Sequence, residues 1–220
     1  QTMVGDWKGL AAVLSTKVER TYDPIERAEL LRRGASVLEE LLGDPEAAIE
    51  LYERAATEDP DDPIALESLD RLFAGASAFE RLAEILGRRL EVEDDPDLKV
   101  EVGLRLGQLN DTQLKRPNQS IDAYLRVLEI EPGQRAAVDA LGALYERQAM
   151  WPELLENLEL RAGMAEADAE RVQLLLAERA ARLRDDETDA FRQRVAARRA
   201  DPSRFGAVPP QARAGAEAPL

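Results

Sequence analysis

The sequence predicts an all-α fold built from a repeating set of helices, and three observations lead to this prediction. The chain resembles itself at an offset of 72 residues, which aligns Trp7 with Phe79 and Trp151. Apolar residues recur at intervals of three and four, as in Ile49 and Tyr52, rather than alternating. Val, Ile and Thr, which favour strands, make up only 24 of the 220 residues. Repetition at a long period is typical of helical arrays.

The helix boundaries are marked in the sequence. Aspartate precedes proline at Asp23, Asp44, Asp62 and Asp95, where the carboxylate can cap the first turn and proline fits the first helical position. We therefore expect helices, with boundaries good to about two to four residues, over 7–20, 24–42, 45–58, 63–74, 79–91, 96–114, 117–130, 134–148, 151–162, 169–184 and 189–200. Residues 201–220 are rich in Ala, Pro, Gly and Arg without periodicity, which predicts a disordered tail.

Composition excludes several classes of function. The formal net charge of -15 disfavours nucleic acid and anionic membrane surfaces as partners, and no apolar run is long enough to span a membrane. The chain has no Cys and no His, which removes disulfides, thiolate nucleophiles, Cys/His metal sites and the usual general base. We expect a cytoplasmic protein that is not an enzyme and has no catalytic residues, cofactor or metal. Arginine outnumbers lysine 25 to 4, which points to a high-GC bacterial genome.

Two local motifs have sharper interpretations that the sequence does not favour. The acidic run over 91–97 lacks the glycine turn that a calcium loop requires, so we interpret it as a solvated connection between helices. Gly103 and Gly107 form a Gly-x-x-x-Gly pair, but Glu101 and Arg105 exclude a membrane helix. This pair predicts close packing between two helices.

The repeating residues resemble the tetratricopeptide repeat (TPR) family, as found in tandem bacterial arrays. The first-helix signature of that family is matched by Val138, Leu141, Gly142 and Tyr145, and again by Leu66, Leu69, Asp70 and Phe73, with Asp70 at the glycine position. The second-helix signature is matched by Ala48, Tyr52, Ala55 and Pro60, and again by Ser120, Tyr124, Val127 and Pro132. The chain departs from the family at Leu82 and Leu154, where alanine is usual.

This resemblance implies a right-handed α-solenoid of antiparallel helix pairs over residues 1–200, with a double-repeat period of 72 residues. The expected units are 1–28 (partial), 29–62, 63–100, 101–134, 135–172 and 173–200 (degenerate). In such a superhelix the first helices line a concave groove that binds partners. The resemblance places these partner-binding candidates there: Arg33, Val37, Glu67, Arg71, Arg105, Leu109 and Asp139. No lysine or asparagine occupies the expected groove positions, so the family's carboxylate clamp is not carried over.

The expected function is a non-catalytic protein-protein interaction module that binds a protein or peptide in this groove. Arg33, Arg71 and Arg105 would form a positive stripe in an otherwise acidic molecule, so an acidic partner segment with apolar anchors is favoured. Two alternatives stay open. In the first, the chain would be a structural spacer or oligomerisation segment of a longer repeat protein. In the second, it would be the accessory domain of an enzyme whose catalytic part is not included in this chain.

The first helix carries an apolar stripe. Trp7, Leu10, Val13, Leu14 and Val18 recur at helical spacing. In the internal copies the corresponding stripe would be covered by the preceding helix, and the 72-residue alignment makes the chain start just after that helix. We therefore expect weak self-association through this end, with Trp7, Leu10 and Leu14 as its candidate residues.

Overall fold

The computed structural model describes residues 6–165 and 167–200, and within them all regular structure is helical, as predicted. The predicted disordered tail, 201–220, lies outside the described residues. The helices are α1 (Trp7–Arg20), α2 (Pro24–Ser36), α3 (Pro45–Glu58), α4 (Pro63–Gly75), α5 (Phe79–Val92), α6 (Pro96–Thr112), α7 (Pro117–Ile130), α8 (Arg135–Gln148), α9 (Trp151–Met164) and α10 (Asp168–Ala200), and a π-helical turn, η1 (Val37–Leu41), extends α2.

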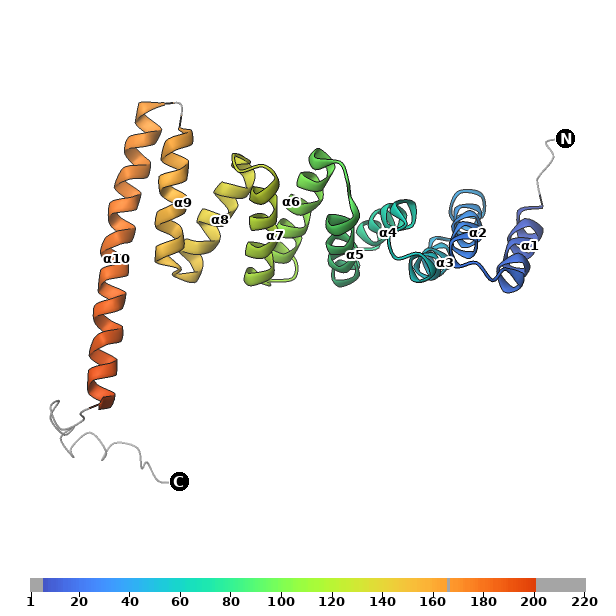
Figure 1. Ribbon diagram of the computed structural model, residues 1–220, viewed down its shortest axis with the longest axis horizontal. Helices are drawn as coiled ribbons and strands as arrows, with labels where there is room; N and C mark the ends of the chain where they lie inside the picture. Colours follow the sequence, from blue (N-terminus) through green and yellow to red (C-terminus); the bar gives the residue numbers. More distant parts are fainter. Residues whose placement is uncertain (1–5, 166, 201–220) are drawn as a thin grey trace, which may run out of the picture. The chain divides into compact units, whose positions relative to one another are not determined.

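The chain divides into two compact units, 1–140 and 141–220, and the division falls within α8. Inside the first unit the helices pack against neighbours in the sequence, α1 on α2, α2 on α3, and so on to α7, as the consecutive labels in Figure 1 show. In the second unit α9 packs along α10. Contact between sequence neighbours is the packing that defines a repeat array.

The predicted aspartate caps are confirmed at all four helix starts. The Asp23 carboxylate accepts a hydrogen bond from the backbone N–H of Ile25 at 2.8 Å, and Asp62 accepts one from Ile64 at 3.0 Å. Asp44 and Asp95 cap α3 and α6 in the same way. Each cap satisfies a backbone donor that the first helical turn leaves without an intrahelical partner, so each fixes where its helix begins.

The turns between the first and second helix of each pair share one backbone conformation. Gly43, Ser77, Lys115 and Ala149 have φ of 66°, 54°, 55° and 55°, the left-handed region that usually follows a helix C-terminus. In the Ser77 turn the next residue, Ala78, donates its N–H to the carbonyl of Phe73 at 3.0 Å, which closes the helix end. These turn residues lie 34, 38 and 34 positions apart, so the pairs alternate in length.

The core of the first unit contains an apolar cluster with members from α1 to α7. Leu66, Leu69 and Phe73 of α4 are at most 1% exposed and lie at its centre. At the α6–α7 contact a Cβ added to Gly103 would lie 2.5 Å from Val127 Cγ2. The two helices are therefore as close as the glycine pair predicts.

One prediction about the helices of the second unit was wrong. We expected helices over 169–184 and 189–200, but α10 is a single helix of 33 residues. Residues 185–188 contain no glycine or proline to end it, and the hydroxyl of Thr188 donates to the carbonyl of Arg184 one turn earlier at 2.7 Å. The expected degenerate repeat unit, 173–200, therefore lies wholly within α10.

Candidate functional site

A depression of about 590 Å³ in the first unit lies over α4 and α6. We call it the α4–α6 wall. Glu67, Arg71 and Arg105, three of the predicted partner-binding residues, line it together. Ser68, Asp70, Arg89, Leu98 and Glu101 also line it, and the sequence did not predict them as part of this surface.

Asp70 is the structural centre of the α4–α6 wall. Its side chain is 4% exposed and accepts hydrogen bonds from Arg105, with Nη1 at 2.8 Å from Oδ2 and Nη2 at 2.6 Å from Oδ1. Arg89 of α5 also donates to Oδ2. The pKa of Arg105 is raised by its hydrogen bond with Asp70. One buried carboxylate thus joins three helices, and Arg105 has a structural role in this wall.

The expected positive stripe needs a correction, because each of its arginines already has a carboxylate partner in the chain. Arg71 donates Nη2 to Oε2 of Glu39 at 2.9 Å and Nη1 to Oε1 of the same side chain, and this hydrogen bond raises the pKa of Arg71. Arg33 pairs with Glu29 one turn earlier in α2. Arg71 and Arg33 are nonetheless 61% and 65% exposed, whereas Arg105 is 39% exposed.

The other candidates, Arg33, Val37, Leu109 and Asp139, do not line this wall. Val37 and Leu109 are each 8% exposed, so they fill the interior and cannot serve as anchors for a partner. Asp139 faces Arg135 in α8 at 3.8 Å. The apolar surface that is accessible near the wall comes instead from Leu98 and Ile64, which are 44% and 53% exposed.

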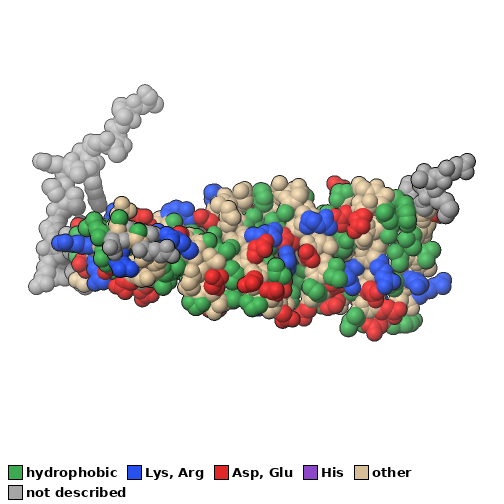
Figure 2. Space-filling view, turned by 90° about the horizontal axis from the view of Figure 1, so that it is seen from above, with side chains coloured by type: hydrophobic (Ala, Val, Ile, Leu, Met, Phe, Trp, Pro, Cys, Tyr) green, Lys and Arg blue, Asp and Glu red, His purple; other side chains and the backbone are tan. Residues whose placement is uncertain are grey.

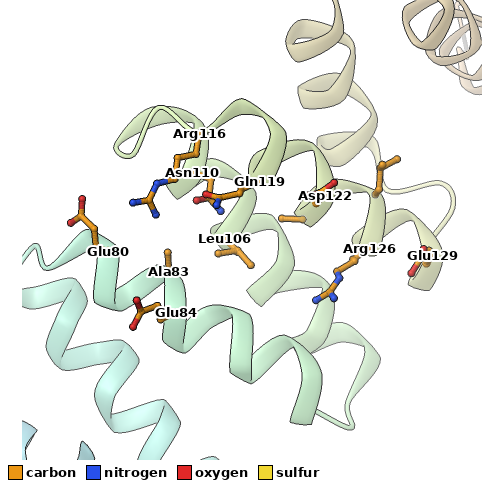
Figure 3. A pocket seen from close by; sticks show the side chains of 12 residues that line it. Glu80, Ala83, Glu84, Leu106, Asn110, Arg116, Gln119, Asp122, Arg126 and Glu129 are labelled. Carbon is orange, nitrogen blue, oxygen red and sulfur yellow. The ribbon is translucent and has the colours of Figure 1, made fainter. Parts of the chain in front are cut away.

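A second depression in the first unit, about 600 Å³ in volume, lies between α5 and α7 with α6 beneath (Figure 3). We call it the α5–α7 groove. None of the predicted partner-binding residues lines it. Leu106 and Asn110 are four positions apart, so they share a face of α6, and this spacing is the one sequence feature that could have indicated the groove.

Three residues of the apolar stripe on the first helix are accessible to solvent. Trp7, Leu10 and Val13 are 37%, 39% and 58% exposed. Leu14 is half-buried against the core, and Val18 is only 3% exposed, so neither is bare. Val18 belongs to the core cluster together with α2 residues such as Leu31, and Leu14 packs against that cluster.

Other kinds of site receive no support from the described part of the chain. Within residues 6–165 and 167–200 no group of three or more acidic side chains is placed to hold a metal ion. Over the same residues no helix combines the length and apolar character needed to cross a membrane. On the face in Figure 2, acidic, basic and apolar side chains are interspersed.

Comparison with known proteins finds similarity in structure only. No family model and no curated protein matches the sequence. The structure of MamA is 20% identical, with a TM-score of 0.43, over 74% of this chain and 93% of that chain. YrrB, described as a TPR protein with an unusual peptide-binding site, is 15% identical, with a TM-score of 0.48, over 79% of this chain and 86% of that one. PilF of Pseudomonas aeruginosa is 16% identical, with a TM-score of 0.42, over 90% and 92%.

Proposed function

We propose that this chain is a non-catalytic interaction module of TPR type that binds a partner protein or peptide at the α4–α6 wall. One observation carries the proposal. The wall is a depression of about 590 Å³ whose side chains are held by the ion pairs of Asp70 with Arg89 and Arg105. A surface ordered before binding loses less conformational entropy when a partner docks.

The partner segment that we propose is acidic with apolar anchors. Arg71 and Arg33 keep N–H groups that are not used by Glu39 or Glu29, because a guanidinium has five donors. Carboxylates of a partner can bind these remaining donors, and apolar anchors can pack on Leu98. The charges already present make this preference modest, since the partner shares each arginine with a carboxylate of the chain.

Reversing Arg71, which lines the wall, together with Arg33, an exposed arginine of α2 outside its lining, tests this proposal. We expect an Arg33→Glu and Arg71→Glu double variant to weaken binding by about 1–3 kcal/mol per paired contact. Arg105 is left unchanged because Asp70 depends on it. Wild type and variant would serve as baits in parallel captures from lysate of the source organism, and the affinity of the captured protein would then be measured by titration calorimetry.

The matched control is an Arg54→Glu and Arg179→Glu double variant, which makes the same change in net charge at exposed positions away from the wall. It should capture the same protein with unchanged affinity. Circular dichroism should show equal helical content in all three proteins. Equal binding by the wall variant and the control would place the partner elsewhere on the molecule.

Oligomerisation is a second candidate function, and the exposed residues of α1 favour it. Burying about 400 Å² of apolar surface contributes about 10 kcal/mol, against association costs of about 4–15 kcal/mol, so only weak self-association is expected. Sedimentation velocity over a hundredfold range of concentration should show a larger species at high concentration.

The cytoplasmic location stays a prediction.

A Trp7→Glu and Leu10→Glu double variant should abolish this association, because both side chains are exposed and lie on one face of α1. An Ala12→Glu and Ser15→Glu double variant adds the same charge to other exposed positions of α1 and should leave it intact. A wild type that stays monomeric at every concentration contradicts the prediction.

A further inference from the structure

The two sides of the α5–α7 groove come from different helices, and its floor is apolar. Glu80, Ala83 and Glu84 come from one face of α5, since they are three and four positions apart. Asp122 and Arg126 come from α7 on the other side, and Leu106 of α6 lies between the two walls (Figure 3). The groove is therefore a channel between two second helices, and it is separate from the α4–α6 wall.

A buried amide faces this groove. Asn110 is 4% exposed and lines the groove. The N–H of Arg116 donates to the backbone carbonyl of Asn110 at 2.8 Å, which holds this end of α6 in place. A carboxamide offers one acceptor and two donors to a ligand in the groove. Those groups match the N–H and C=O of an extended peptide backbone.

The charge of the groove selects the side chains of such a peptide. Its acidic lining residues are Glu80, Glu84, Asp122 and Glu129. None of these four makes an ion pair within the described ranges, 6–165 and 167–200. Of the two basic lining residues, Arg126 is paired with Glu91, which leaves Arg116 as the uncompensated positive charge. Four carboxylates against one such arginine favour a cationic ligand.

We propose that the α5–α7 groove binds a linear basic segment of a protein partner, with an apolar side chain on the floor formed by Leu106 and Ala83. The amide of Asn110 pairs with the backbone of that segment, and its arginines or lysines meet the carboxylates of α5 and α7. Nucleic acid does not fit a groove with this charge. The proposal concerns a second surface and stands independently of the α4–α6 wall.

The test uses the full chain and a defined probe, the fluorescein-labelled peptide Arg-Arg-Ser-Leu-Ser-Arg-Arg with an amidated C-terminus. Its affinity would be measured by fluorescence anisotropy at low salt, with peptides in which glutamate replaces arginine or serine replaces leucine as controls. We expect saturable binding of the basic peptide below about 1 mM. The glutamate peptide should not bind, and the serine peptide should bind more weakly.

Variants separate recognition from general attraction to an acidic protein. A Glu84→Lys and Asp122→Lys double variant changes exposed groove positions and should weaken binding at least tenfold. A Glu19→Lys and Glu50→Lys double variant makes the same charge change at exposed positions outside the groove and should weaken it less than threefold. Asn110→Ala, which changes no charge, should weaken binding about fivefold to tenfold.

Three results would overturn the proposal: no saturable binding of the basic peptide, equal losses in the two lysine variants, or binding indifferent to Asn110→Ala. Amide resonances of the Asn110 side chain, assigned from their absence in the alanine variant, should shift on titration with the basic peptide. The double arginine variant, Arg33→Glu and Arg71→Glu, should bind the peptide at least as well as wild type. Failure of the wall proposal therefore leaves this result unchanged.

Discussion

Replacing Asp70 with alanine is expected to lower the free energy of unfolding by about 3–5 kcal/mol, because it leaves two arginines without their buried carboxylate. The Asp70 side chain is 4% exposed, and that of Arg89 is 14% exposed. Arg89 cannot easily reach water to replace the lost hydrogen bonds, whereas Arg105, whose side chain is 39% exposed, can do so in part. Urea unfolding of the full chain, followed by circular dichroism, measures the change.

Two further variants define what Asp70 contributes. Glu67→Ala lies on the same helix and the same wall, but Glu67 is exposed, so a change within about 0.5 kcal/mol is expected. Asp70→Asn keeps one acceptor oxygen and the shape of the side chain. Its loss of unfolding free energy should therefore fall between those of Asp70→Ala and Glu67→Ala. If Asp70→Ala lowered the free energy of unfolding no more than Glu67→Ala does, the ion pairs would not stabilise the fold.

Adding a methyl group at Gly103 is expected to destabilise the α6–α7 pair by about 1–3 kcal/mol. The added Cβ would lie 2.5 Å from Cγ2 of Val127, which is 0% exposed and has little freedom to rotate. Alanine favours a helix over glycine by about 1 kcal/mol, which offsets only part of the overpacking. Urea unfolding of Gly103→Ala would show the net loss.

A control and a double-mutant cycle make this prediction specific. Gly87 is helical and has no atom within 4 Å of an added Cβ, so Gly87→Ala should raise stability by about 0.5–1 kcal/mol. Combining Gly103→Ala with Val127→Ala removes the clash, so the double variant should be less destabilised than the sum of the single variants by at least about 0.5 kcal/mol. Additive effects would contradict the close contact.

Local features of this fold were predictable because their causes lie close together in the sequence. Asp62 caps α4 through N–H groups two and three residues ahead, so the cause of this helix start lies within the local sequence. The Asp-Pro pair alone is not decisive, because Asp59-Pro60 lies at the end of α3. The break expected at residues 185–188 does not occur. Acidic residues do not end a helix in the absence of glycine or proline, and α10 continues through them.

The wall residues were predicted in part. Glu67, Arg71 and Arg105 lie on it, since first-helix positions with a common spacing face the same side. Their partners were not predictable. Glu39 is 32 residues from Arg71, and Asp70 is 35 residues from Arg105, and many other acids lie at comparable distances along the chain. Val37 and Leu109, predicted as partner-binding residues, occupy the interior.

The periodic apolar residues, the aspartate caps and the glycine pair together decide which segments become helices and which of their faces pack. These depend on neighbours within one or two turns, whose geometry is the same in every helix. The stacking of successive helix pairs decides which carboxylate each arginine meets, whether Asn110 faces a groove, and how much of α1 stays exposed. Such contacts depend on the distance and rotation between helices, and packed side chains from the whole unit set those quantities.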